Sequence, residues 1–204
     1  MLIGLSGKIG TGKSSLARHM QAHDAQAVWK HCAFADGLKA ETARIFDYPL
    51  DWAFHEKMKT RVIPVKPEYT VRGRTSKPPQ PTMSIREVLQ WWGTQVRRTL
   101  DPDHWVTILD RAYQRHRSIA DYFIVDDVRY KNEADYIRRS GGYLVRVAPY
   151  SGWAPGHNAD HESETGLDGY TDFHLWITPG RDRLQEAART IMISHDIMYQ
   201  RRNP

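Results

Sequence analysis

The sequence has 204 residues, with 29 Lys and Arg against 24 Asp and Glu, so its formal net charge is +5 and its pI is near 9.3. A hydrophobic fraction of 40% is enough for a folded core and argues against disorder. The single cysteine, Cys32, excludes an internal disulfide framework and a Cys-rich zinc site. The apolar run Met1–Ile3 is too short for a signal peptide or a membrane span. We therefore expect one soluble cytoplasmic domain, with room for an inserted lobe.

The positive charge is concentrated in the middle of the chain. The stretch Lys57–Arg98 holds ten basic and two acidic residues, and the rest of the sequence sums to −3. The segment Ser151–Asp172 holds five carboxylates and neither Lys nor Arg. This distribution indicates one surface built to bind anions, although a solvated, mobile loop would have the same composition.

In chain order, short apolar runs alternate with longer segments that have helical periodicity. A strand at Leu2–Leu5 is followed by a glycine-rich turn and then by a helix over Lys13–His23. The other predicted strands lie near Ala27–Phe34 and at Tyr122–Val125, Tyr143–Val147 and Phe173–Thr178, and the other helices at about Gly37–Phe46 and Asp182–Tyr199. Strands separated by helices predict an α/β fold with a parallel sheet that is covered on both faces.

The middle of the chain departs from this alternation. Five of the eleven prolines lie between Pro64 and Pro81, which predicts an inserted loop because proline removes backbone donors. Ser84 and Glu87 then form a capping box at the start of an apolar helical series from Ile85 to Leu100. A strip beside the buried face of that helix carries Arg86, Gln90, Gly93 and Arg97. An ordinary amphipathic helix with solvated arginines is the alternative.

The turn after the first strand carries the most specific motif of the sequence. Residues Gly7-Lys8-Ile9-Gly10-Thr11-Gly12-Lys13-Ser14 fit G-x-x-x-x-G-K-[ST] between a predicted strand and a predicted helix. In such a loop, backbone N–H groups and the positive end of the following helix hold phosphate oxygens. We expect Lys13 to reach the β and γ phosphates and Ser14 to ligate Mg²⁺. The full set expected to bind ATP here is Gly7, Gly10, Thr11, Gly12, Lys13, Ser14 and Ser15.

Charged side chains follow two of the predicted strands. Asp126 and Asp127 come directly after Tyr122–Val125, at the carboxyl edge of the sheet where ligands of open α/β sheets bind. One of these carboxylates can hold Mg²⁺, with Asp126 nearer the strand, and Arg129 can neutralise charge on a transferring phosphoryl group. A turn with a surface ion pair is the alternative.

After the second strand, Asp36 and Lys39 are expected at the same edge. A carboxylate at position 36 can accept a hydrogen bond from a substrate hydroxyl, and Lys39 can meet a substrate phosphate. Capping of the following helix is the competing role for Asp36.

The ordered combination of these features resembles the phage-type deoxynucleoside monophosphate kinases, a branch of the P-loop nucleotide kinases. The resemblance extends from about Leu2 to Leu167. The matching residues are Gly7–Ser14, Phe34–Asp36, Leu38-Lys39, Arg86–Gln90, Gly93-Thr94, Arg97-Arg98, Asp101–Asp103, Trp105, Asp126–Arg129, Asn132–Asp135, His161 and Ser163-Glu164. Only the phosphate loop is specific by itself.

The resemblance implies transfer of the ATP γ-phosphoryl group to a deoxynucleoside 5′-monophosphate (dNMP), with Mg²⁺ as cofactor. It implies a P-loop nucleoside-triphosphate hydrolase and kinase fold with a five-stranded parallel sheet. A single nucleotide kinase domain would consist of a core at residues 1–46 and 103–204, a substrate-binding lobe at about 47–102 and a lid at about 151–172. The residues it implies for the substrate are Asp36, Lys39, Arg86, Gln90, Trp91, Arg97, Arg98 and Glu164.

The sequence departs from adenylate-kinase-like enzymes in its lid, and the roles of a few other residues stay open. The lid of adenylate-kinase-like enzymes supplies arginines, but Ser151–Asp172 has none, so Arg129 or basic residues elsewhere must serve. His157 and His161 could assist, with a surface position as the alternative for His157. Arg181 is a candidate to stack on the ATP adenine. Either Trp91 or Trp92 is a candidate for base stacking, and we expect one of the two in the core.

Two other functions would also use a phosphate loop that binds a nucleotide. One is a kinase that phosphorylates a modified base or a hydroxyl in DNA, with Arg72–Lys77 following the phosphate backbone. The other, from a different class, is a nucleotide-dependent DNA-binding or packaging ATPase module. The sequence favours small-molecule substrates over nucleic acid or membrane partners, because the basic excess falls in the acceptor lobe, and it leaves a homodimer open.

Overall fold

The computed structural model describes residues 1–154, 161–180 and 183–202. Two compact units make up the fold: the sheet unit, Met1–Phe34 with Leu109–Pro204, and the middle unit, Ala35–Ile108. Within the described ranges, none of the helices combines the length and hydrophobicity needed to cross a bilayer.

The sheet unit contains one five-stranded parallel sheet, in the order β2-β7-β1-β8-β9. Its strands are β1 (Leu2–Ser6), β2 (Trp29–Cys32), β7 (Tyr122–Val128), β8 (Tyr143–Val147) and β9 (Leu175–Ile177). The α/β fold and its five parallel strands, as predicted from the sequence, are confirmed. Every residue of β1 is buried, as expected for a central strand with covered faces.

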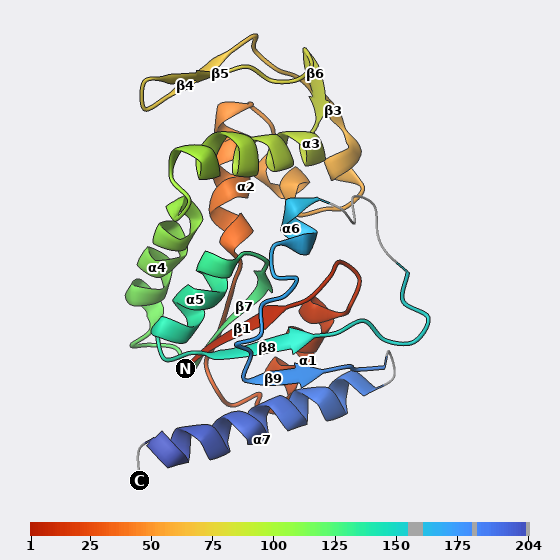
Figure 1. The fold of residues 1–204 in the computed structure, drawn as a ribbon, viewed down its shortest axis with the longest axis vertical. Coiled ribbons are helices and arrows are strands. Elements are labelled where there is room, and N and C mark those ends of the chain that lie inside the picture. The colour runs from red at the N-terminus through yellow and green to blue at the C-terminus, as the bar shows by residue number, and fades with distance from the viewer. Residues whose placement is uncertain (155–160, 181–182, 203–204) are drawn as a thin grey trace. The chain divides into compact units, whose positions relative to one another are not determined.

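Helices cover both faces of this sheet (Figure 1). The helices of the unit are α1 (Lys13–His23), α4 (His104–His116, which starts in the middle unit), α5 (Lys131–Arg139), α6 (Glu162–Thr165) and α7 (Leu184–Arg202). On one face, Ile3 and Leu5 pack with residues of α1 and α7 in a single apolar core. On the other face, Ile137 of α5 lies so close to Gly4 that a Cβ there would be 3.0 Å from it.

The middle unit contains short strands, turns of helix and an aromatic core. Its elements are α2 (Phe34–Ile45), η1 (Leu50–Ala53), η2 (Met58–Thr60), β3 (Val62–Pro64), β4 (Tyr69–Val71), β5 (Arg74–Ser76), β6 (Thr82–Ser84), α3 (Ile85–Gln90) and η3 (Trp91–Arg98). Strand β3 pairs with β6 and β4 with β5, both antiparallel. Phe46, Trp91 and Trp92 lie at the centre of its core.

Several elements of this unit or its border differ from the sequence prediction. Residues 69–76, predicted as loop, form a β-hairpin whose turn residues Arg72 and Gly73 have φ of 49° and 78°, the combination a type I′ turn requires. Helix α2 begins at Phe34 rather than near Gly37. The helix predicted through Leu100 changes at Trp91 into a π-helix, in which each N–H bonds five residues back. The capping box of Ser84 and Glu87 is confirmed.

Candidate active site

The phosphate loop lies between β1 and α1, as the motif requires. Gly12 stands at the N-cap of α1 with φ of 91°, a left-handed conformation that glycine adopts without strain. A Cβ on Gly7 would lie 2.4 Å from the carbonyl oxygen of Val147, so only glycine fits there. Because Gly12 has no side chain to cap α1, the first backbone N–H groups of the helix suit an anion.

Lys13, the lysine of the motif, is buried and folded back onto the loop. Its Nζ donates hydrogen bonds to the carbonyl oxygens of Gly7 at 2.7 Å and Lys8 at 2.8 Å. Burial, together with the positive charge of Arg129, lowers the pKa of Lys13 to about 8, although Glu164 and Asp126 act in the opposite direction. The Lys13 ammonium group can exchange these carbonyl contacts for a phosphate, whose negative charge would raise the pKa of Lys13 again.

Asp126 connects the phosphate loop to strand β2. Its carboxylate is buried, accepts a side-chain hydrogen bond from Ser14 and lies 3.0 Å from His31 Nε2. Burial alone would raise the pKa of Asp126, but the hydrogen bonds from His31 and Ser14 lower it overall. The structure therefore brings together the hydroxyl and one carboxylate that the sequence analysis assigned to Mg²⁺.

Asp127 takes a different partner. Its Oδ1 accepts a hydrogen bond of 2.7 Å from the backbone N–H of Phe34, the first residue of α2. The two aspartates lie inside β7 rather than after it, at a break in register where Gly4–Ser6 of β1 pairs with Val125–Val128. The extra residue in β7 is a bulge of the kind that re-aims neighbouring side chains.

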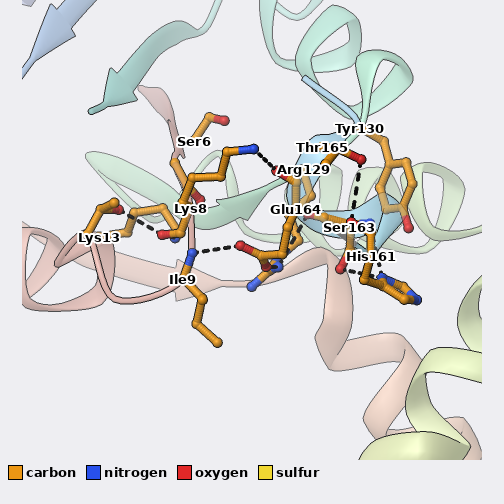
Figure 2. A network of polar contacts seen from close by, with 12 residues as sticks. Ser6, Lys8, Ile9, Lys13, Arg129, Tyr130, His161, Ser163, Glu164 and Thr165 are labelled. Atoms are coloured by element: carbon orange, nitrogen blue, oxygen red, sulfur yellow. Dashed lines mark hydrogen bonds and ion pairs between the residues drawn. The ribbon is translucent and has the colours of Figure 1, made fainter. Parts of the chain in front are cut away.

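Arg129 and the short helix α6 meet at the phosphate loop (Figure 2). The Arg129 guanidinium contacts the Glu164 carboxylate and donates to the carbonyl oxygen of Ser163 at 3.3 Å. The other carboxylate oxygen of Glu164 accepts a hydrogen bond of 2.7 Å from the backbone N–H of Ile9, within the loop. Lys8 Nζ donates to the backbone oxygen of Glu164 at 2.6 Å and to Asp168 at 2.7 Å.

A cavity of about 280 Å³ opens beside the same loop. Its lining residues are Gly10, Thr11, Gly12, Ser15, Tyr150, Pro179 and Leu184. Four of them were expected to bind ATP, whereas Tyr150 and Leu184 were not anticipated from the sequence. The adenine-stacking candidate Arg181 and the histidine His157 lie outside the described residues.

In the middle unit, Asp36 and Lys39 form a local pair. Lys39 Nζ lies 3.3 Å from Asp36 Oδ1 and 4.2 Å from the ring centre of Phe54. Asp36 lies in the first turn of α2 and not at its N-cap, because the helix begins two residues earlier. The capping role considered for Asp36 is therefore excluded, and its expected contact with substrate stays a prediction.

The arginines of α3 and the π-helix are engaged with acidic partners. The Arg86 guanidinium contacts the Glu56 carboxylate, which is 69% exposed. Arg97 Nε donates to Glu41 Oε1 at 2.5 Å, and Trp92 Nε1 donates to the same oxygen at 2.6 Å. The Glu41 side chain is only 13% exposed, and the sequence did not reveal its role because its partners lie more than 50 residues away along the chain.

The remaining substrate candidates lie along the same helical run. Trp91 and Trp92 are 5% and 1% exposed, so the expectation that only one of them is in the core is wrong. Gln90 is the last residue of α3, and Arg98 NH1 donates to the carbonyl oxygen of Pro102 at 3.4 Å.

Another missed residue is His31, whose signal would have been its place in β2, the strand that pairs with β7. Among the described residues, no group of three or more His, Cys, Asp or Glu side chains could hold a metal by itself. Mg²⁺ in nucleotide sites usually takes one or two protein ligands and completes its shell with phosphates and water. The Ser14 hydroxyl and the Asp126 carboxylate fit that pattern.

A family model described as deoxynucleotide monophosphate kinase matches residues 50–174. No curated protein matches the chain. Among solved structures, a shikimate kinase from Acinetobacter baumannii in complex with shikimate matches with a TM-score of 0.44 and 10% identity, covering 94% of this chain and 90% of that chain. The family match includes Arg86, Asp126, Arg129 and Glu164 and begins after the phosphate loop.

Proposed function

The chain belongs to the deoxynucleotide monophosphate kinase family and is a nucleotide kinase, and from this premise we propose that it phosphorylates a dNMP with ATP, giving the diphosphate and ADP. One observation carries the proposal: Lys13, the Ser14–Asp126 pair and Arg129 all lie around one phosphate loop in the sheet unit. The loop motif and the family match occupy different parts of the sequence, so they support the proposal independently.

The donor nucleotide is proposed to bind in the sheet unit. The phosphate loop would hold its phosphates through backbone N–H groups and Lys13. The 280 Å³ cavity next to Gly10–Gly12 would receive the nucleoside, with Tyr150 as one wall. The Ser14 hydroxyl and Asp126 would hold Mg²⁺, which neutralises charge on the phosphates when bound.

The reaction itself needs little covalent chemistry from the protein. An oxygen of the acceptor phosphate attacks the γ-phosphorus, and the bond between that phosphorus and the β–γ bridging oxygen breaks to release ADP. Lys13 and Arg129 would counter the negative charge on the transferring group, a role worth roughly 10²–10³ in rate for a single donor in other enzymes. We propose that a lid at about 151–172 excludes water during this step.

The acceptor is proposed to bind in the lobe at about 47–102, with Asp36 and Lys39 nearby. Arg86 is the best-supported phosphate ligand, because its partner Glu56 is largely exposed and such pairs contribute only about 0–1 kcal/mol. A phosphate dianion can therefore displace Glu56 at little cost. Arg97 is held by Glu41, whose side chain is only 13% exposed, so we place it second, with Arg98 and Gln90 as further candidates.

A product assay tests the proposal. Terminally labelled ATP is offered with each common deoxynucleoside and ribonucleoside monophosphate, and in parallel with single- and double-stranded DNA. We expect label in at least one deoxynucleoside diphosphate and none in DNA. Label in DNA, or release of phosphate that depends on DNA, would contradict a dNMP acceptor and favour one of the two rival functions.

A further inference from the structure

The short helix α6 places a carboxylate inside the phosphate loop. Glu164 is only 6% exposed, and its two oxygens take different partners. One accepts the Ile9 N–H of the loop at 2.7 Å, and the other contacts the Arg129 guanidinium. Figure 2 shows Glu164 pointing from α6 toward Ile9 and Arg129. A loop N–H and a guanidinium are the types of donor that hold a phosphate.

The surrounding charges explain why a carboxylate is held there. Lys13 and Arg129 are close enough for the positive charge of Arg129 to lower the pKa of Lys13, so two mutually repelling cations lie beside the loop. Glu164 supplies a negative charge that acts in the opposite direction. Glu164 is therefore a counter-ion supplied by the chain itself.

Helix α6 is fastened at this position by contacts on either side of Glu164. Lys8 Nζ donates to the Glu164 backbone oxygen at 2.6 Å and to Asp168 at 2.7 Å. Arg146 lies 3.5 Å from Asp168 and donates to Ser6 at 2.9 Å. Because Lys8 belongs to the phosphate loop, these contacts join α6 directly to the loop.

We propose that the Glu164 carboxylate is an internal phosphate surrogate, which occupies donors of the phosphate loop in the ligand-free enzyme and which ATP displaces on binding. This inference rests on the proposed function, because it requires a nucleotide at the loop. Displacement of Glu164 frees the Arg129 guanidinium for the phosphates at the moment they arrive. The carboxylate also lowers the affinity for ATP by competing for the same donors.

Calorimetric titration with ATP tests the competition, using the wild-type chain, Glu164→Gln and Glu162→Gln. Glu162 is the matched control: it lies on the same helix, is exposed and carries the same charge. We expect Glu164→Gln to bind ATP about tenfold more tightly, the amount that loss of one charge-assisted contact by the competitor produces. We expect Glu162→Gln to stay near wild type, because an exposed charge is screened.

Hydrogen exchange of the wild-type chain gives a second readout that needs no variant. If ATP displaces Glu164, exchange of the Glu164 and Gly166 amides should speed up, since their bonds to His161 and Glu162 stabilise α6. Slower exchange there, or equal or weaker ATP binding by Glu164→Gln than by wild type, would overturn the surrogate role and leave the kinase assignment intact. Failure of the wild type to bind ATP would overturn both.

Discussion

At the scale of single residues, neighbouring carboxylates have separate tasks because they take different partners. Asp126 is tied to Ser14 and His31, while Asp127 accepts from the backbone of Phe34. The sequence predicts both aspartates directly after a strand, and its pattern does not decide which of them holds Mg²⁺. The choice depends on which way each side chain points, and this is set by the bulge in β7 that no local pattern shows.

Asp126→Asn should raise the Mg²⁺ concentration for half-maximal activity by about 10–100-fold, because an amide is a weaker ligand than a carboxylate. Asp127→Asn should leave this concentration near its wild-type value, since the amide oxygen can still accept from Phe34. Steady-state rates over a Mg²⁺ titration measure both. A larger effect in Asp127→Asn would reverse the assignment.

Lys13 makes stability depend on pH in a defined direction. Its pKa is about 8 in the folded chain and 10.5 when unperturbed, so the unfolded state binds more protons between these values. Stability conferred by this position therefore rises with pH through that window. Relative to Lys13→Met, the wild type should gain on the order of 1–2 kcal/mol in unfolding free energy from pH 7.5 to 9.5.

Urea unfolding of both proteins without nucleotide, at the two pH values, measures this difference. Subtracting the unfolding free energy of the variant cancels the contributions of the titratable groups that both proteins share. Lys13→Met should also lose nearly all turnover while keeping its fold. A pH-independent difference would mean that Lys13 is not buried as a charge in the ligand-free chain, and retained activity would exclude it from the reaction.

At the scale of elements, the sequence predicted what is locally encoded. The strands of the sheet, the phosphate loop and α1 follow from apolar runs and from glycine spacing, and their positions are confirmed, except that β7 continues three residues beyond its predicted end at Val125. The start of α2 was not, because the N–H of Phe34 is satisfied by Asp127, 93 residues away, rather than by a neighbouring cap. N-cap preferences, which favoured a later start, consider only residues next to the helix and so do not include Asp127.

The π-helix Trp91–Arg98 escaped prediction for a similar reason. Its hydrogen-bond pattern is rarely stable by itself, and here it places Trp92 and Arg97, five residues apart, on the same side. Both donate to one oxygen of Glu41, and His104 lies 3.4 Å from the other. Glu41 lies more than 50 residues from Trp92 and Arg97 along the chain. Its contacts with them favour the π-helix, which the apolar periodicity of the sequence does not predict.

Glu41→Ala should therefore destabilise the middle unit by about 3 kcal/mol, because it leaves a largely buried guanidinium and an indole N–H without their acceptor. Glu41→Gln should cost less, since its amide oxygen can still accept. Tryptophan fluorescence during urea unfolding measures both variants. The control is Glu68→Ala at an exposed position of the same unit, which should lower the unfolding free energy by less than about 0.5 kcal/mol. Equal effects at positions 41 and 68 would contradict the role of Glu41.

At the scale of the whole molecule, the charge is uneven along the chain within each unit rather than between the two units. All of the basic stretch Lys57–Arg98 belongs to the middle unit, and the acidic stretch containing α6 belongs to the sheet unit. The middle unit as a whole has 12 basic and 9 acidic residues and the sheet unit has 17 and 15, so the net charge of +5 divides into +3 and +2. Within the proposed function, the basic stretch Lys57–Arg98 of the middle unit attracts the monophosphate, and the sheet unit holds the triphosphate with its own cations.

This division predicts a selective kinetic effect of Arg86→Ala. Loss of the guanidinium should raise the KM for the monophosphate by about tenfold or more, the effect of one charge-assisted phosphate contact, and leave the KM for ATP nearly unchanged. Stability should change little, since the pair with exposed Glu56 contributes only about 0–1 kcal/mol.

Arg44→Ala is the matched control, because it removes the same charge from an exposed position of the same unit. It tests whether overall attraction rather than a specific contact holds the monophosphate, and it should leave both KM values near wild type at physiological salt. Steady-state kinetics with each substrate varied in turn separate the two constants. If Arg86→Ala raised both constants equally, the residue would not belong to a separate acceptor site, and the assignment of monophosphate binding to the middle unit would lose its main support.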